Sequence, residues 1–204
     1  MKVDMEKVSY ILGRSIAGDF QRQSVDIHVD AFVDAFRGAM AGEPSRIRVA
    51  EMQQIMEGFK GLMQERQRSA ASEKSQANLE KGKAYLAENR KQAGVVETAS
   101  GLQYRIIQEG RGKSPLATDT VETHYEGRTI DGTVFDSSVK RGKPASFPVN
   151  GVIQGWQEAL QLMKEGAKYE LFIPSDLAYG ANGAGSAIGP YETLIFEVEL
   201  LKVM

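Results

Sequence analysis

The residue types that most often carry enzyme chemistry are scarce in this sequence. The chain has 204 residues, no cysteine and two histidines, His28 and His124. The lack of cysteine excludes disulfides, thiolate metal ligands and cysteine nucleophiles, and two histidines are too few for a three-histidine zinc site. We expect no metal and no cofactor. We interpret His124 as a structural strand residue and His28 as a surface residue at a helix start.

A glycine-rich segment, residues 183–189, suggests a phosphate-binding loop at first sight. Its glycines follow the spacing GxGxxxG, and no Lys-Ser or Lys-Thr pair follows them, so nucleotide binding is not expected. The 25 Lys and Arg residues are balanced by 27 Asp and Glu, whereas a nucleic-acid surface needs a basic excess. We interpret Lys140, Arg141 and Lys143 as a solvated surface cluster and expect no nucleic-acid partner.

The N-terminal residues do not have the pattern of a targeting signal. Asp4, Glu6 and Lys7 interrupt the stretch that an export signal needs to keep apolar. No window approaches 18 uncharged apolar residues, so we expect no membrane span and no membrane partner. The chain is predicted to be cytoplasmic.

The composition changes near residue 94. Residues 1–93 hold 7 of the 21 glycines and one of the 6 prolines, while residues 94–204 hold the only Trp and 10 of the 16 aromatic residues. The first part is typical of helices and the second of strands and turns.

Two amphipathic helices are predicted near the N-terminus. The first begins after Asp4, a suitable N-cap, and ends near Gln23; the second begins at Asp26 or Asp30 and stops at Gly42. Two helices alone cannot bury both apolar stripes. The stripes either pack on the rest of the chain or form a dimer interface with a second copy. We predict the dimer, with the contact residues Ile11, Leu12, Ile16, Phe20, Phe32 and Phe36.

A third helix is predicted from about Val49 to about Arg90. No proline interrupts this stretch, and good helix formers dominate it, so it would extend roughly 60 Å. Residues 64–83 hold Leu79 as their only large apolar side chain. We expect that segment to be solvated on every side and to bridge two bodies. A flexible linker is the alternative, because Gly82 weakens the helix.

The remaining residues predict an α+β fold, an antiparallel sheet with one short helix on a face. The Asp131-Gly132 pair marks a hairpin turn between two strands. The only helix candidate is 152–163. Tyr169 and Phe172 are interpreted as core. Further strands are predicted over 102–110, 146–150, 167–174 and 193–203.

Four segments of this strand-rich part occur in a distinctive order. They are HYEGRTIDGTVFDSS at 124–138, VIQGWQEAL at 152–160, LFIPSDLAYG at 171–180 and TLIFEVELLKV at 193–203. Together they make residues 98–204 resemble the FKBP-type peptidyl-prolyl cis/trans isomerases. By helix order and length, the remainder resembles the Mip-like (macrophage infectivity potentiator) subgroup. The resemblance implies three parts: a helical dimerisation domain over 1–43, a long connecting helix over 44–93 and an FKBP-type catalytic domain over 94–204.

The resemblance implies an enzyme that accelerates rotation about X–Pro bonds. This rotation is slow because about 18–20 kcal/mol of amide resonance resists twisting. The twisted amide is less charge-separated than the planar one, so an apolar, water-poor cleft disfavours the planar ground state. The reaction needs no nucleophile, metal or cofactor.

The resemblance also implies the residues of that cleft. Trp156 would form its floor, Asp136 and Tyr179 would orient substrate carbonyls, the backbone N–H of Ile153 would donate to the ligand, and Arg141 would pair with Asp136. The catalytic set is Tyr125, Phe135, Asp136, Trp156, Tyr179 and Phe196, and the substrate-binding set is Val152, Ile153, Arg141 and Ile188. The alternative interpretation makes the same aromatic residues a plain hydrophobic core.

Several positions depart from the usual family pattern. Ala145, Ala184, Gly185 and Ala187 replace bulkier side chains, and Gly189 replaces the first proline of a common pair. We expect a thinner pocket rim and a more flexible loop, with consequences for inhibitor affinity and substrate selectivity.

The sequence is compatible with two main functions. One is a prolyl isomerase that assists protein folding, with chaperone-like protein binding through a dimeric N-terminal region. The other is a polypeptide-holding chaperone with little turnover; a dimeric scaffold is a third, purely structural possibility. The intact aromatic and carboxylate set favours the enzyme. The partners implied are unfolded or partly folded proteins with X–Pro bonds, a second copy of the chain, and macrolide inhibitors such as rapamycin.

Overall fold

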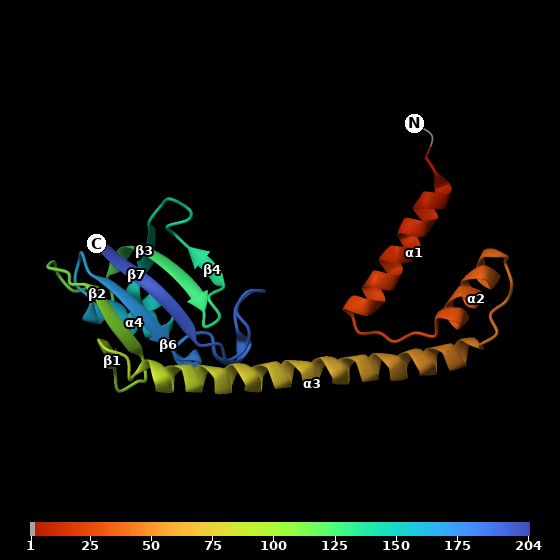
Figure 1. Cartoon of the computed structure of the whole chain (residues 1–204), viewed down its shortest axis with the longest axis horizontal. Helices are drawn as coiled ribbons and strands as arrows, with labels where there is room; N and C mark the ends of the chain where they lie inside the picture. The colour runs from red at the N-terminus through yellow and green to blue at the C-terminus, as the bar shows by residue number, and fades with distance from the viewer. Residues whose placement is uncertain (1–2) are drawn as a thin grey trace. The chain divides into compact units, whose positions relative to one another are not determined.

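The computed structural model describes residues 3–204, which form two compact units that meet between Met63 and Gln64. Helix α3 (Val49–Asn89) is continuous through this boundary, as Figure 1 shows. The segment is therefore a helix and not a flexible linker. Among the described residues, no helix combines the length and apolarity needed to cross a bilayer.

The first unit contains α1 (Met5–Arg22), α2 (Val29–Met40) and the start of α3. The Asp4 carboxylate caps α1 by accepting hydrogen bonds from two backbone N–H groups of the first turn, as predicted. The N-cap of α2 is His28, which makes no side-chain capping bond. The predicted starts at Asp26 and Asp30 were therefore wrong. Asp30 lies inside the first turn, where its charge favours the helix N-terminus.

The apolar stripes of α1 and α2 are not covered within one chain. No residue of either helix is buried, and Ile11, Leu12 and Phe36 are each more than half exposed. One ring contact joins the two helices, an edge-to-face pair between Phe20 and Phe32 with centroids 5.9 Å apart. A single copy of these helices therefore lacks a core.

The second unit is built on an antiparallel sheet of seven strands (Figure 1). The strands are β1 (Val95–Glu97), β2 (Gln103–Gln108), β3 (Thr120–Thr129), β4 (Val134–Ser137), β5 (Ala145–Pro148), β6 (Lys168–Ile173) and β7 (Leu194–Val203). Their order is β1-β2-β6-β7-β3-β4, with β5 also paired to β3. The sequence did not predict β1, because three residues are too few to show an alternation.

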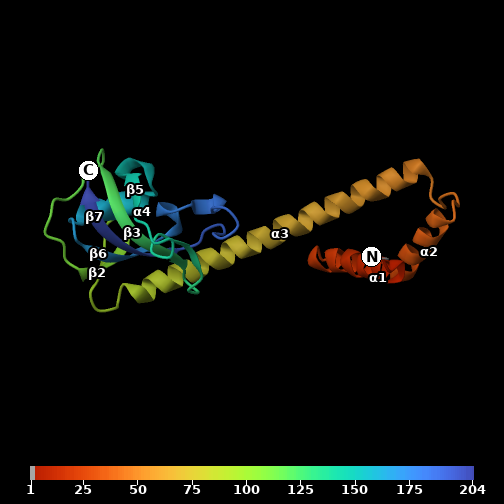
Figure 2. The ribbon, with the colours of Figure 1, turned by 90° about the horizontal axis from the view of Figure 1, so that it is seen from above.

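One face of the sheet holds the core and the helix α4 (Gln154–Leu162), seen among the strands in Figure 2. Alternate residues of β3 are buried, as expected for a strand with one core-facing side. The core includes Trp156, Leu160 and Met163 from the α4 region together with residues of β3, β6 and β7. A short 3₁₀ helix, η1 (Val149–Gly151), precedes α4, and two more, η2 (Ser175–Leu177) and η3 (Gly180–Asn182), follow β6.

The other face of the sheet is covered by the C-terminal turns of α3. The Tyr85 ring lies 6.2 Å from the Phe172 ring of β6, and the Asn89 amide donates to Gln103 Oε1 of β2 at 2.9 Å. Gly82 is buried, and a Cβ placed there would lie 2.4 Å from Thr193 Oγ1. The predicted solvation of residues 64–83 on every side was therefore wrong at Gly82, because a glycine makes the contact there instead of a large apolar side chain.

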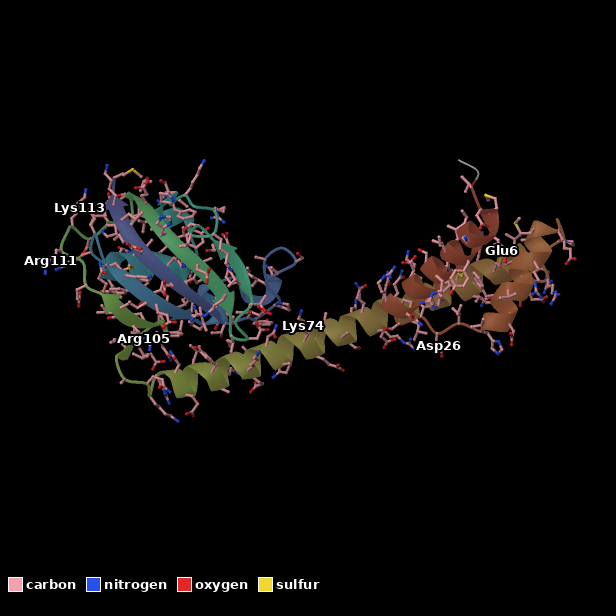
Figure 3. All side chains as sticks on the ribbon, turned by 45° about the horizontal axis from the view of Figure 1, so that its top comes forward. Glu6, Asp26, Lys74, Arg105, Arg111 and Lys113 are labelled. Atoms are coloured by element: carbon pink, nitrogen blue, oxygen red, sulfur yellow. The ribbon has the colours of Figure 1, made fainter. Side chains whose placement is uncertain are left out.

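This cover also explains why both faces of β6 are buried. Glu170 is only 7% exposed, and its carboxylate accepts hydrogen bonds from Arg128 Nη2 at 2.6 Å and from Arg105, labelled in Figure 3. Two guanidinium groups compensate the buried charge, which would be costly if left unpaired. Tyr169 and Phe172 are buried as predicted.

Candidate active site

A cavity of about 560 Å³ opens on the α4 side of the sheet. Its walls come from β3, β4, β5, the start of α4, the loop after Tyr179 and strand β7. The lining residues are Tyr125, Phe135, Asp136, Phe147, Gly151, Val152, Ile153, Trp156, Tyr179, Ala184, Gly185, Ala187, Ile188 and Phe196.

Trp156 forms the centre of an aromatic cluster at this cavity. It lies in the first turn of α4 and is 4% exposed. Its ring meets those of Tyr125, Phe147 and Phe196 edge-on, with centroids 5.3, 5.9 and 5.4 Å away. Phe135 meets Phe196 in the same manner at 5.5 Å. Edge-to-face is a favoured arrangement of aromatic rings, so each of these contacts stabilises the apolar surface.

One carboxylate stands at the edge of this apolar surface. Asp136 Oδ2 accepts a hydrogen bond from the Tyr125 hydroxyl at 2.5 Å, and Oδ1 accepts one from Arg141. Arg141 Nη2 also donates to the Tyr125 hydroxyl oxygen at 2.9 Å. The predicted pair of Arg141 with Asp136 is therefore present. The three side chains hold one another in a closed triangle.

The triangle controls the charge of Asp136. Burial opposes ionisation, but the hydrogen bonds from Tyr125 and Arg141 and the positive charge of Arg141 outweigh it and lower the pKa of the carboxyl. Burial and the hydrogen bond to Asp136 raise the pKa of the Tyr125 hydroxyl. At neutral pH the site therefore holds a carboxylate beside a neutral phenol.

The structure brings together all six residues of the predicted catalytic set at this cavity. Val152, Ile153 and Ile188 of the predicted substrate-binding set also line it, whereas Arg141 does not line it and acts on Asp136 and Tyr125. Sequence reasoning missed Phe147 and Gly151. Phe147 sits on the short edge strand β5, whose alternation was the only available signal.

Two hydrogen-bond donors at the cavity have no partner among residues 3–204. The indole Nε1–H of Trp156 is buried without an acceptor. The backbone N–H of Ile153, the N-cap residue of α4, likewise makes no hydrogen bond within the described chain. Ile153 is only partly buried and lines the cavity, so its N–H is free to donate to a bound molecule.

The other sequence features have structural roles here. His124 Nδ1 lies 3.1 Å from Ser138 Oγ, and the same Oγ accepts a hydrogen bond from the Tyr125 backbone N–H. The glycine-rich segment forms a small hairpin in which Ala184 and Ile188 exchange backbone hydrogen bonds. Its inner side lines the apolar cavity.

Comparison with known proteins places both parts of the chain. Residues 112–201 match the family model described as FKBP-type peptidyl-prolyl cis-trans isomerase, and residues 5–106 match the domain amino terminal to it. The 22 kDa FKBP-type peptidyl-prolyl cis-trans isomerase of Escherichia coli is 44% identical over 199 residues, covering 97% of this chain and 95% of the relative.

Two further proteins support the same assignment. A Legionella longbeachae protein named outer membrane protein MIP is 41% identical over 203 residues, covering 100% of this chain and 87% of the relative. The crystal structure of FkpA from Escherichia coli matches with a TM-score of 0.83 at 34% identity, covering 100% of this chain and 98% of that one. The cytoplasmic location of this chain stays a prediction.

The fold, the family models and the full-length relatives agree, and this chain belongs to the FKBP-type peptidyl-prolyl cis-trans isomerases.

Proposed function

We propose that the cavity around Trp156 binds the proline ring of a substrate and there accelerates rotation of the preceding amide bond. The observation that carries the proposal is the combination of an aromatic floor with a single oriented carboxylate at its edge. The apolar floor excludes water from the amide and so disfavours its charge-separated planar form. Electrostatic interactions are also stronger in such a water-poor site.

The polar groups have distinct tasks in this proposal. The Ile153 N–H donates to a substrate carbonyl and fixes the peptide direction. Asp136, kept ionised by Arg141, attracts the carbon of the rotating carbonyl as its oxygen leaves the amide plane. Tyr179, 40% exposed at the cavity rim, contacts the residues flanking proline. Hydrogen bonds that tighten only in the twisted geometry lower the barrier.

The N-terminal unit serves protein substrates in the same proposal. Its uncovered stripes on α1 and α2 pair with those of a second copy, which gives a homodimer with two-fold symmetry. Apolar surface left at this base holds unfolded segments and raises their local concentration near the pockets. Macrolide inhibitors such as rapamycin would compete for the proline cavity, with the small side chains of the 184–187 loop limiting their contact.

The pocket assignment is tested by cis/trans relaxation of a short X–Pro peptide. Asp136→Asn should lower kcat/KM at least tenfold, about 1.4 kcal/mol in barrier. Asp131→Asn is the matched control, because Asp131 lies in the exposed turn of the same hairpin and outside the cavity. Full activity of Asp136→Asn would show that the carboxylate has no part in the reaction.

The holding chaperone is the competing function. It predicts that the wild-type chain binds unfolded protein but barely accelerates peptide relaxation. In contrast, the isomerase should speed both the peptide reaction and a proline-limited protein refolding reaction. Measuring the two rates on the same preparation separates these functions.

A further inference from the structure

One side of the proposed proline pocket rests on the connecting helix. The loop residues Ala184, Gly185, Ala187 and Ile188 line the cavity. The chain then passes through Gly189 and Pro190 toward β7. The side-chain amide of Asn78 in α3 donates a hydrogen bond to the backbone carbonyl of Pro190, with Nδ2 and O 2.8 Å apart. The two residues are 112 positions apart in the sequence, so only the tertiary fold brings them together.

Gly189 allows this close approach. A Cβ placed there would lie 3.2 Å from Asn78 Nδ2, 3.4 Å from Lys74 Cε and 3.1 Å from Glu192 Oε1. The distances to Glu192 and Asn78 are tighter than most Cβ contacts, so a side chain at this position would force the Asn78 amide or the Glu192 carboxylate to shift by a few tenths of an ångström. Lys74, labelled in Figure 3, marks this part of α3.

The backbone next to the contact is strained. Tyr191 has a φ of +54°, in the left-handed region that bulky residues rarely adopt. Its N–H donates to the Gly180 carbonyl, at the other end of the same loop, at 2.8 Å. Such a conformation persists only where its surroundings over-determine it. Here the Gly180 bond holds one side and the Asn78 bond holds the other.

The loop transmits this restraint to the cavity as a unit. Ala184 and Ile188 exchange two backbone hydrogen bonds, of 2.9 and 3.1 Å, and Ile188 is 8% exposed at the pocket wall. Ile188 lies two residues before the carbonyl that Asn78 holds. A shift at Pro190 therefore displaces a wall of the pocket.

We infer that Asn78 is a positioning residue for the isomerase reaction. It touches no substrate, and it fixes the pocket loop, residues 180–190, through the Pro190 carbonyl. The inference rests on the proposed assignment of the cavity as the proline site. A loop that is already ordered loses less freedom when substrate binds, so removal of the Asn78 bond should weaken binding before it slows the chemical step.

The test compares two amide deletions on the same helix, in the full-length chain. Asn78→Leu keeps the side-chain bulk but removes the donor to the loop. Asn89→Leu is the matched control. It removes the hydrogen bond of 2.9 Å that the Asn89 side-chain amide donates to the buried Gln103 of β2, and Gln103 does not line the cavity. Gly189→Ala disturbs the same contact from the loop side.

We expect Asn78→Leu to lower kcat/KM on an X–Pro peptide by roughly three- to tenfold, the size expected for one neutral hydrogen bond. The change should appear mainly in KM. Hydrogen exchange of the Ile188 amide should become faster, since this bond reports on loop order. Gly189→Ala should act in the same direction. Asn89→Leu should lower the midpoint of thermal unfolding at least as much as Asn78→Leu does. It should leave kcat/KM and the exchange rate of the Ile188 amide unchanged.

Two results would overturn the inference. One is an Asn78→Leu variant with wild-type kcat/KM, whatever its exchange rate. The other is an equal loss in Asn89→Leu, which would show that both amides act through general stability. Asp136→Asn in the same assay separates this failure from that of the pocket assignment, because a wrong pocket leaves Asp136→Asn fully active.

Discussion

The two units of this chain treat their apolar residues in opposite ways. In α1 and α2 no residue is buried, and large apolar side chains such as Leu12 and Phe36 are exposed. Residues 64–204 bury one continuous core from Leu102 to Val203. The second unit completes its core from its own strands and therefore holds rigid side chains at a site. The first presents apolar stripes of the kind that mark association surfaces.

The largest effect is expected from a charge placed on one of the exposed apolar stripes of α1 and α2. The wild-type chain should scatter light as a particle of about twice its 22.4 kDa mass. Phe36→Asp should convert it fully to monomer at micromolar concentration, because an interface carboxylate would lose its hydration without a partner. Activity on a short peptide should not change.

Arg37→Asp is the control for that variant. It introduces the same carboxylate one residue along α2, on a different face of the helix, and changes the net charge by −2 where Phe36→Asp changes it by −1. The dimer should stay intact despite the larger change in charge. A wild-type monomer at micromolar concentration would remove the assembly role proposed for α1 and α2.

The next largest effect is expected at the centre of the second unit. Trp156→Ala should lower kcat/KM at least tenfold and destabilise residues 64–204 by about 3–5 kcal/mol, since it empties a buried aromatic position. Phe172→Ala should destabilise to a similar extent while keeping the kcat/KM of the folded fraction, because Phe172 lies outside the cavity. Denaturant titration and the peptide assay measure both effects. Equal loss of activity in the two variants would reduce Trp156 to a core residue.

Replacing glycine by alanine at two positions of α3, one in each unit, should change stability in opposite directions. Gly61 has nothing within 4 Å of a Cβ placed on it, so Gly61→Ala should stabilise by about 0.5–1 kcal/mol through helix propensity. At Gly82 the new Cβ would clash with Thr193, so Gly82→Ala should destabilise by about 1 kcal/mol. Calorimetry of each full-length variant gives the sign. Stabilisation by both would contradict the packing of α3 on the sheet.

The smallest expected effect is the pH dependence of the site. The lowered pKa of Asp136 means that the ionised carboxylate favours the folded state. That contribution is present above the unfolded value of about 3.9 and is lost as the pH falls through the folded pKa. Activity should therefore stay flat between about pH 6 and pH 8.

Arg141→Met should move the carboxyl titration of Asp136 to higher pH, because it removes a hydrogen bond and a positive charge. Carbon-13 NMR of the carboxyl group follows this change directly. An unchanged titration would show that Tyr125 alone sets the charge of Asp136.

Much of the fold and of the site could be predicted from local patterns. The alternation in β3 and the Asp131-Gly132 turn are set by neighbouring residues, because strand faces have a period of two and the turn needs a residue with positive φ. The predicted helix at 49–90 matches α3 because its residues are good helix formers. The FKBP-like segments then named the residues that the structure gathers at one cavity.

The contacts between distant segments were decided only by the tertiary structure. Sequence reasoning missed the docking of α3, because Asn78, Gly82 and Asn89 form no apolar stripe, and a glycine gives no signal of what lies against it. Phe147 joined the cavity only through the pairing of β5 with β3. The sequence by itself determined which elements form and which side chains could make a proline pocket. The tertiary structure decided which carbonyl Asn78 meets 112 residues away, since a close contact depends on the relative position of two backbones and not on the pattern within either.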